Sequence, residues 1–455
     1  MFDKFLSKTI ENTQELVRYL EEGCKPAEAW KIGTEHEKFG YRKVDLGPLQ
    51  YSGACSIESI LKGLIETFGW LPMLEDDQLI GLSKDGANIS LEPGGQLELS
   101  GALLDNVHQT CMEVANHLAE VKTIADTIGA GFIGLGAAPV WKHADMPVMP
   151  KGRYKLMAPY MEKVGSHGTQ IMFRTCTVQV NLDYSSEADM KKKLRVGLAL
   201  QPMATALFSA SPFFEGRKTG YNSYRSRIWQ DTDIARTGML PFVFEEGFGF
   251  ESWVDYALDV PMYFVYRNGK YLNALGKSFR DFLKGELSIL PNEKPLMSDW
   301  EDHLTTIFPE VRLKKFIEMR GADAGPWAKI CALPAFWVGL IYDQSSLDKA
   351  WDLCKDWTSA ERQQLYQDVA KYGLRASIRN KQVKEIALDL LNLSYEGLLR
   401  RGKPNVHGTK KDESEFLLPL FEILEKGSSL ADEILNKYLT KWSGDLRHIY
   451  PEYCY

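Results

Sequence analysis

Apolar and polar residues alternate with a period of two in several separate stretches of this 455-residue chain. This period predicts β-strands over residues 31–41, 89–100, 131–135, 174–183 and 315–320. Helical spacing predicts an opening helix between residues 10 and 30, and further helices over 56–68, 104–128 and 187–208. Because the strands alternate instead of being apolar throughout, we expect an antiparallel sheet with one polar face and helices on the other.

The last part of the chain has a different pattern. Helical spacing there predicts helices over residues 345–357, 359–370, 382–400 and 413–426. The sequence therefore predicts an α+β fold, with a core over residues 1–344 that includes an N-terminal helix. A helical C-terminal region over residues 345–455 is expected to pack on this core.

Composition excludes several classes of protein. The 54 lysines and arginines against 61 acidic residues give a net charge of −7, so nucleic acid is not an expected partner. The first six residues lack a secretory signal, and no apolar run approaches the roughly 18 residues that span a membrane. The seven cysteines are dispersed without a Cys-x-x-Cys motif, which argues against a disulfide scaffold or a zinc ribbon. We expect a cytoplasmic protein with mostly reduced cysteines.

Two stretches imitate nucleotide-binding motifs. Residues 129–134 spell G-x-G-x-x-G, but they follow a long predicted helix and open a strand, which reverses the order that the dinucleotide fold needs. Gly129 is better interpreted as the C-cap of that helix. Gly276-Lys277-Ser278 ends like a P-loop, but the required first glycine is Tyr271.

Pairs of acidic residues give the first indication of chemistry. Glu35 and Glu37 lie two apart on a predicted strand, so they share one face while His36 points the other way. Two such like charges repel unless a cation neutralises them, and Mg²⁺ prefers carboxylate oxygens and substrate phosphates. The alternative is a solvated edge strand with two surface acids.

Three further strands also present a polar face. Gln96 and Glu98 follow the Pro-Gly-Gly turn after Glu92, and Glu318 and Arg320 alternate with apolar neighbours. The polar face of the strand over 174–183 consists of Thr175, Thr177, Gln179, Asn181 and Asp183. Together these strands predict a bed of acids and amides that could hold two or three Mg²⁺ ions against a triphosphate. The histidines are not spaced as zinc ligands.

Arginines and aromatic residues supply candidate substrate contacts. Arg225 and Trp229 lie in a turn-rich stretch, and the planar fork of arginine fits a carboxylate or a phosphate. Arg153 lies in a basic and aromatic loop, and Met262 and Tyr263 could line an apolar pocket. Each of these groups could instead be a surface ion pair or ordinary packing.

Several of these stretches are similar to a known family. Residues 33–40, 91–100, 173–181, 236–242, 318–323 and 331–337 resemble, in order, blocks of the plant and proteobacterial glutamate–cysteine ligases. The resemblance implies a glutamine-synthetase-like core with a curved antiparallel sheet of about six strands and helices on its outer face.

The resemblance also implies a reaction. ATP would phosphorylate the γ-carboxylate of L-glutamate, and the amine of L-cysteine would attack the γ-glutamyl phosphate to give γ-glutamylcysteine, the first step of glutathione synthesis. Glutathione is an expected feedback inhibitor. The alternative that remains open is a related carboxylate–amine ligase with another amino-acid acceptor. A second alternative is an inactive regulatory protein that binds nucleotide and Mg²⁺, but the intact acids Glu35, Glu37, Glu98 and Glu318, with Arg320, argue against it.

Site residues carry over from the family by position. Six residues of this chain resemble the metal ligands of the family: Glu35, Glu37, Glu92, Glu98, Gln179 and Glu318. Arg320, which with Glu318 is expected to be catalytic, resembles the arginine that meets the γ-phosphoryl group. Arg225 and Trp229 resemble the clamp on the glutamate α-carboxylate. Arg153, Met262 and Tyr263 resemble pocket residues near the cysteine site.

The family also gives meaning to two cysteines. Cys111 and Cys331 match a pair that can form a disulfide in the plant enzymes and influence dimerisation there. A second plant pair falls at Ala274 and Ile289, so that bond cannot form in this chain. In the reducing cytosol of a bacterial enzyme, which is the expected setting, formation of the Cys111–Cys331 bond stays open. Both a monomer and a homodimer are compatible with the sequence.

Overall fold

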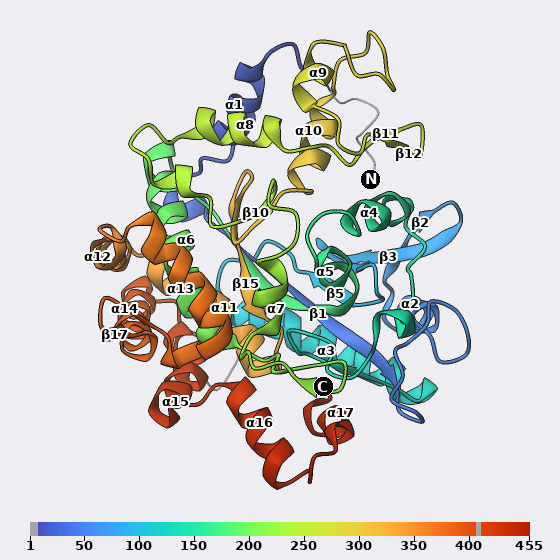
Figure 1. The fold of residues 1–455 in the computed structure, drawn as a ribbon, viewed down its shortest axis with the longest axis vertical. Coiled ribbons are helices and arrows are strands. Elements are labelled where there is room, and N and C mark those ends of the chain that lie inside the picture. Colours follow the sequence, from blue (N-terminus) through green and yellow to red (C-terminus); the bar gives the residue numbers. More distant parts are fainter. Residues whose placement is uncertain (1–7, 406–410) are drawn as a thin grey trace.

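The computed structural model describes residues 8–405 and 411–455, so the first six residues lie outside the described part. Its centre is a nine-stranded sheet in which every pairing is antiparallel (Figure 1). The order is β14-β15-β7-β1-β5-β4-β3-β2, and β6 pairs with the far half of β1. The strands are β1 Ile32–Arg42, β2 Leu71–Glu75, β3 Gln78–Lys84, β4 Ala87–Leu91, β5 Leu97–Ser100, β6 Ala130–Ile133, β7 Thr177–Leu182, β14 Val311–Leu313 and β15 Ile317–Asp323.

The antiparallel α+β class is confirmed, but the sheet has nine strands and not about six. One reason is that the stretch over 89–100 forms two strands, because the turn around Gly95, with a φ of 81°, folds it into the β4–β5 hairpin. A second reason is the β2–β3 hairpin, which the sequence pattern does not predict. The strand expected from residue 174 begins at Thr177, since Arg174 ends α5 (Gly168–Arg174).

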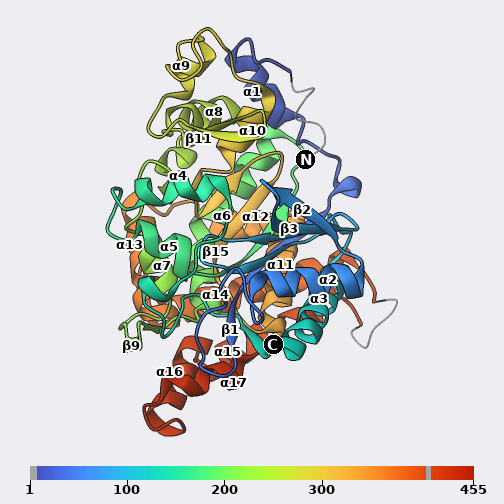
Figure 2. The same ribbon diagram turned by 90° about the vertical axis from the view of Figure 1, so that its right-hand side faces the viewer.

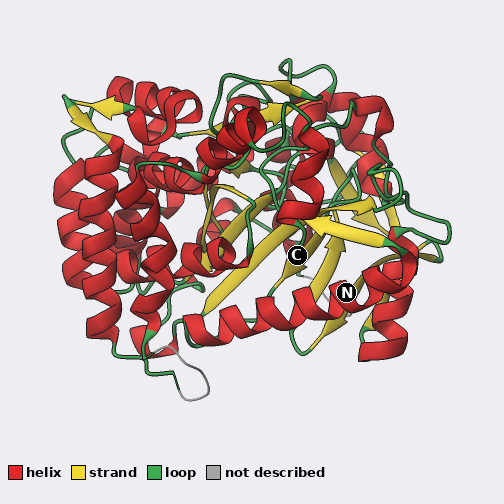
Figure 3. Cartoon of the chain, turned by 90° about the horizontal axis from the view of Figure 1, so that it is seen from below, coloured by secondary structure: helices red, strands yellow, loops and turns green. Residues whose placement is uncertain are grey.

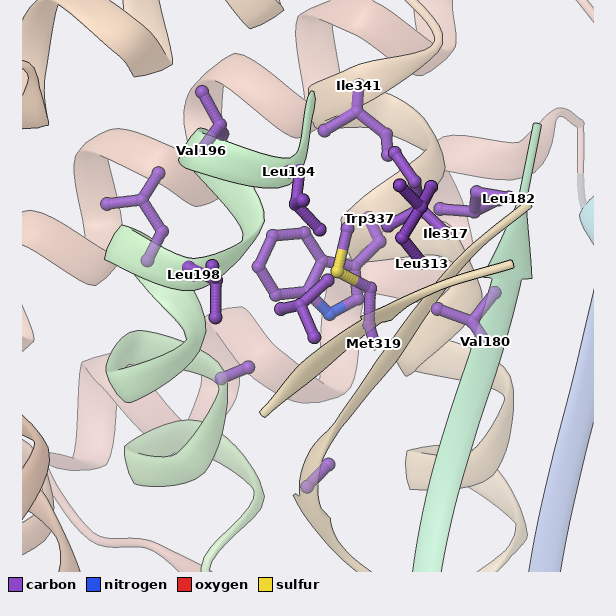
Figure 4. Packing of buried hydrophobic residues seen from close by; sticks show 14 of the residues in the cluster. Val180, Leu182, Leu194, Val196, Leu198, Leu313, Ile317, Met319, Trp337 and Ile341 are labelled. Atoms are coloured by element: carbon purple, nitrogen blue, oxygen red, sulfur yellow. The ribbon is translucent and has the colours of Figure 1, made fainter. Parts of the chain in front are cut away.

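Long helices cover the apolar face of the sheet. α3 (Val107–Ile128) and α6 (Glu187–Phe208) were expected, and α2 (Ile57–Phe68) begins at its N-cap Ser56. α11 (Trp327–Ile341) was not expected from periodicity, because it is apolar almost all round and contains Pro334. Figure 4 shows Trp337 of α11 and Leu194 of α6 packed against Met319 of β15 and Val180 of β7.

Smaller elements complete the fold (Figures 2 and 3). The remaining α-helices before residue 344 are α1 Thr13–Glu21, α4 Gly152–Met161, α7 Tyr224–Trp229, α8 Phe250–Asp259, α9 Phe279–Leu283 and α10 Met297–Leu304. The later helices are α12 Gln344–Cys354, α13 Ser359–Tyr372, α14 Val383–Arg401, α15 Leu418–Lys426, α16 Leu430–Thr440 and α17 Ile449–Tyr453. Two-stranded pairs are β8 Phe213–Phe214 with β9 Arg217–Lys218, β10 Thr237–Gly238 with β13 Phe308–Pro309, β11 Phe264–Arg267 with β12 Lys270–Asn273, and β16 Ser377–Ile378 with β17 Lys381–Gln382. The division of the chain at residue 344 stays a prediction.

The fold bears on two features considered in the sequence, the glycine motif at Gly129 and the possibility of a membrane span. Gly129 is the C-cap of α3 with a φ of 72°, and its N–H bonds to the carbonyl of Ala125, so it does not open a nucleotide loop. Among the described residues, every helix is too short or too polar to cross a bilayer.

Candidate active site

A cleft of about 470 Å³ lies over the polar face of the central sheet, a volume typical of small-molecule sites. Strands β1, β5, β7 and β15 form its floor, and α4, α5 and α7 contribute to its walls. Ten of the predicted site residues line it: Glu35, Glu37, Glu92, Glu98, Gln179, Glu318, Arg320, Arg225, Trp229 and Arg153. The strands thus bring together in space residues that are almost 300 positions apart in the sequence.

Strand alternation places the two acids of β1. Glu35 and Glu37 both line the cleft, while His36 between them is fully buried on the opposite face. The amide of Asn181 donates to Glu35 Oε1 at 2.7 Å, and the backbone N–H of Thr177 donates to Glu37 Oε2 at 3.0 Å. Both carboxylates are therefore oriented by β7, the neighbouring strand.

Register sets Glu37 directly opposite Glu98 of β5. Glu98 accepts hydrogen bonds from Ser100 Oγ at 2.9 Å and Ser90 Oγ at 3.1 Å, neither of which brings a positive charge. Burial, followed by the charge of Glu92, raises the pKa of Glu98 to about 7. Burial, followed by Glu92 and Glu98, raises the pKa of Glu37 well above its ordinary value.

Glu35 belongs to the same acidic group. Burial, with the charges of Glu318 and Glu98, raises the pKa of Glu35 to about 7. Buried like charges directly opposite each other are destabilising, and a hard cation with oxygen ligands removes the conflict. The chemistry of this donor set therefore fits Mg²⁺, although no three such side chains among residues 8–405 and 411–455 form a metal-holding group as they stand.

Glu318 has different surroundings. Arg312 donates to both carboxylate oxygens of Glu318, from Nε to Oε2 and from Nη2 to Oε1, the latter at 2.9 Å. Arg320 Nη1 also donates to Oε2, at 3.0 Å. Lys314 Nζ lies 3.8 Å from the same carboxylate. Burial alone would raise the pKa of Glu318, but these three cations hold it well below its ordinary value. Both oxygens of this predicted metal ligand are thus already bound by arginine.

Arg320 connects two predicted site residues. Its Nη1 donates to Gln179 Oε1 at 2.7 Å as well as to Glu318. The amide oxygen of Gln179, a second predicted metal ligand, is therefore also directed to an arginine. These two bonds fix the plane of the guanidinium at the floor of the cleft, and the side chain keeps 11% exposure there.

Three donors along the cleft have no partner within the described part of the chain. These buried atoms are Arg225 Nη1, Trp229 Nε1 and Arg153 Nε. Arg225 Nη2, in contrast, donates to the backbone oxygen of Arg320 at 3.0 Å, which fixes the guanidinium beside the floor. Because a buried donor without an acceptor is costly, these atoms indicate a ligand with acceptor oxygens.

Met262 and Tyr263 lie behind the residues that line the cleft. Both are 1% exposed and neither lines the cleft. Tyr263 lies behind the wall, where its hydroxyl donates to Met161 Sδ at 3.2 Å. The apolar wall is formed instead by Met73, Ile80, Met157, Met161, Ile171, Met172, Phe264 and Tyr271. Met161 itself lines the cleft, so Tyr263 lies directly behind the cleft lining, and a role for Met262 and Tyr263 in the substrate pocket stays a prediction.

Sequence reasoning also missed two cations in the cleft, Arg312 and Lys314. They alternate with Val311 and Leu313, so the period-two pattern of a strand could have identified them. Lys151, at the N-cap of α4, is another cleft cation and belongs to the basic and aromatic loop that the sequence indicated around Arg153.

Behind the sheet, Cys111 of α3 and Cys331 of α11 form a disulfide, with Cα atoms 5.2 Å apart. The bond joins two helices on the apolar side of the sheet and does not line the cleft. Cys24, Cys55, Cys176, Cys354 and Cys454 are free.

Comparisons with known proteins show which family the chain belongs to. The model of glutamate-cysteine ligase family 2 matches residues 31–452. Glutamate–cysteine ligase B, chloroplastic, from Oryza sativa subsp. japonica is 53% identical over 97% of this chain and 87% of its own length. The chloroplastic enzyme of Arabidopsis thaliana is 52% identical over 97% of this chain and 83% of its own.

A solved structure agrees at the level of fold. The crystal structure of glutamate–cysteine ligase from Francisella tularensis in complex with AMP superimposes with a TM-score of 0.55 at 12% identity. The superposition covers 93% of this chain and 89% of the Francisella tularensis chain.

The same comparisons overturn one expectation. The relatives are named as chloroplastic enzymes, so the expected cytoplasmic, bacterial location is wrong. The physical reason is that receptors read a targeting segment, whereas the composition of a folded enzyme does not encode its compartment.

Proposed function

Since the chain belongs to glutamate–cysteine ligase family 2 and is a ligase that forms γ-glutamylcysteine, we propose that it does so in the cleft over the central sheet, with ATP and Mg²⁺. The observation that carries this proposal is the direct opposition of Glu37 and Glu98 on the floor that also holds Arg320. The AMP complex of the Francisella tularensis enzyme supports a nucleotide as co-substrate.

We assign Mg²⁺ to the acidic side of the cleft. Glu35, Glu37, Glu92 and Glu98 would hold two or three ions, because these half-buried carboxylates line the cleft and form no ion pair with a described lysine or arginine. When bound, the ions neutralise the triphosphate and the charge that develops on the transferred phosphoryl group. Glu318 and Gln179 face the same floor, and their contacts support a different task, which is to orient Arg320.

The remaining residues would position glutamate between these groups. The held guanidinium of Arg320 points donors at the phosphoryl group that leaves ATP for the γ-carboxylate. Arg225 Nη1 and Trp229 Nε1 are free to bind the α-carboxylate. The acceptor amine then attacks the acyl carbon of γ-glutamyl phosphate from the side of Arg153 and the methionine-rich wall, and inorganic phosphate leaves as the amide bond forms. Glutathione, which carries the same γ-glutamyl group, would compete for this position. The chloroplastic names of the relatives support a plastid location.

One assay tests the reaction and its acceptor. The purified protein is incubated with glutamate, ATP and Mg²⁺, and with cysteine, 2-aminobutyrate or another amine, while ADP release and the product mass are measured. We expect γ-glutamylcysteine, with cysteine preferred and no turnover in excess chelator. Equal turnover with unrelated amines would favour a ligase with another acceptor, and turnover without a divalent ion would contradict the Mg²⁺ assignment.

A further inference from the structure

Asp323, the last residue of β15, is a buried carboxylate that the proposed mechanism does not use. It is 1% exposed and accepts three hydrogen bonds from the segment before α7. Ala210 N donates to Oδ2 at 2.8 Å, Ser211 Oγ to Oδ2 at 2.6 Å, and Ser223 Oγ to Oδ1 at 2.7 Å. Among the described residues, no lysine or arginine forms an ion pair with it. Its bonding capacity is therefore directed to one short stretch of chain.

Both serines also hold α7, the helix that presents Arg225 and Trp229. Ser223 is the N-cap of α7, and its hydroxyl accepts from Ser226 N at 3.1 Å. Ser211 Oγ accepts from the backbone N–H of Arg225 at 3.2 Å. A six-residue helix has little stability of its own, so its orientation depends on such tertiary contacts.

The strand that carries Asp323 reaches Arg225 at a second point. Arg320 lies three residues earlier on β15, and its backbone oxygen accepts from Arg225 Nη2 at 3.0 Å. β15 therefore fixes both the backbone of Arg225, through Asp323 and Ser211, and its guanidinium, through Arg320. The side chain of Arg320 lies in the cleft beyond this contact.

We propose that Asp323 is a positioning residue that sets the distance between the Arg225 guanidinium and Arg320. This inference rests on the proposed role of Arg225 as the clamp on the glutamate α-carboxylate. The α- and γ-carboxylates of glutamate are separated by a fixed number of bonds. A shift of α7 relative to β15 would therefore misplace the γ-carboxylate even when the α-carboxylate is bound. Misplacements of about 1 Å can cost about a hundredfold in rate.

The test is Asp323→Asn, which keeps the side-chain volume but replaces one acceptor oxygen by a donor. We expect the KM for glutamate to rise at least about tenfold, with the KM for ATP changed less than about twofold, because only the α7 contacts are lost. The matched control is Asp183→Asn. Asp183, which the strand pattern placed on the polar face, lies just past the end of β7 and does not line the cleft. It is also buried, and it accepts from Lys25 Nζ at 2.8 Å and from Lys31 N at 2.7 Å. The control should lower the melting temperature without changing the KM for glutamate.

A second pair of variants separates the two proposals. Arg225→Lys should raise the KM for glutamate by itself, and adding Asp323→Asn to it should cause little further change, because the group that Asp323 positions is gone. If Arg225→Lys leaves this KM unchanged, the assignment of Arg225 fails and the inference fails with it. If Arg225→Lys raises the KM but Asp323→Asn does not, only the role of Asp323 is overturned.

Folding failure of Asp323→Asn would be detected by circular dichroism. In that event Ser211→Ala decides the question, because it removes only the hydroxyl that joins Asp323 to the backbone of Arg225. A KM for glutamate raised at least about threefold supports the inference, and an unchanged KM overturns it.

Discussion

The two halves of the cleft shift the pKa of their glutamates in opposite directions. On β1 and β5, Glu37 and Glu98 oppose each other without a cation, and burial with like charge raises the pKa of both. On β15, Glu318 is more deeply buried, at 0% exposure, yet Arg312, Lys314 and Arg320 surround it and lower its pKa. The residue type is the same, so its neighbours decide whether a carboxylate needs an external cation or already has an internal one. The acidic half is suited to bind an external cation, whereas Glu318 in the other half holds arginines in place.

The largest expected effect comes from breaking the cation-bound half. Glu318→Gln leaves Arg312, Lys314 and Arg320 without a counter-charge. We expect the free energy of unfolding to fall by about 3–5 kcal/mol, since removal of one partner strands buried charges. Turnover should fall by about two orders of magnitude or more as Arg320 loses its orientation. Chemical denaturation and steady-state kinetics measure both, and a Gln variant as stable as the wild type would contradict the comparison.

The same substitution in the acidic half should separate activity from stability. Glu37→Gln should also lower turnover by about two orders of magnitude or more, because a metal ligand is lost. Its melting temperature without Mg²⁺ should stay unchanged or rise, since a buried like charge is removed. Glu58→Gln, on the outer helix α2, is the control and should alter neither property appreciably. Near-normal turnover of the Glu37 variant would refute the metal assignment.

A smaller effect tests the substrate clamp at the edge of the two halves. Arg225→Ala removes a charge-assisted hydrogen bond from Nη1 to the α-carboxylate, worth roughly 2–3 kcal/mol. We expect the KM for glutamate to rise about 30- to 150-fold, with kcat less affected. Initial rates at varied glutamate concentration provide the measurement. If the KM is unchanged, another residue holds the α-carboxylate.

The smallest effect concerns pH. Burial and neighbouring acids raise the folded-state pKa of Glu35 and of Glu98 to about 7, above the unfolded value near 4.5. The folded protein therefore binds more protons than the unfolded chain between about pH 4.5 and 7, and these groups favour folding less as the pH rises through that range. Mg²⁺ replaces those protons, so its stabilising effect should be larger near pH 8 than near pH 6.

Thermal denaturation with and without Mg²⁺ at the two pH values checks this expectation. Glu98→Gln is the informative variant, because it should reduce the pH dependence of the Mg²⁺ effect. A Mg²⁺ effect of the same size at both pH values would show that no proton is displaced, which contradicts binding by these carboxylates.

Much of the site could be predicted from short-range pattern. The alternation around Glu35 and Glu37 predicts that they share a face, and the structure confirms it with His36 buried behind them. The pattern of a single strand could not distinguish Glu318 from the other acids, because its partner Arg312 lies on another strand, β14, and only the pairing of β14 with β15 brings the two side chains together. It also could not show that Met262 and Tyr263 lie behind the cleft lining, since sequence shows apolarity but not which layer an apolar residue occupies.

The sequence by itself determined the antiparallel α+β class, the long helices α3 and α6, and the set of polar strand faces, because these depend on periodicity and on caps within one element. The tertiary structure decided the register that sets Glu37 against Glu98, the layer to which each aromatic belongs and the cations around Glu318. Those features depend on side chains from distant strands meeting in low-dielectric surroundings. Their energies are therefore fixed by position in space and not by position along the chain.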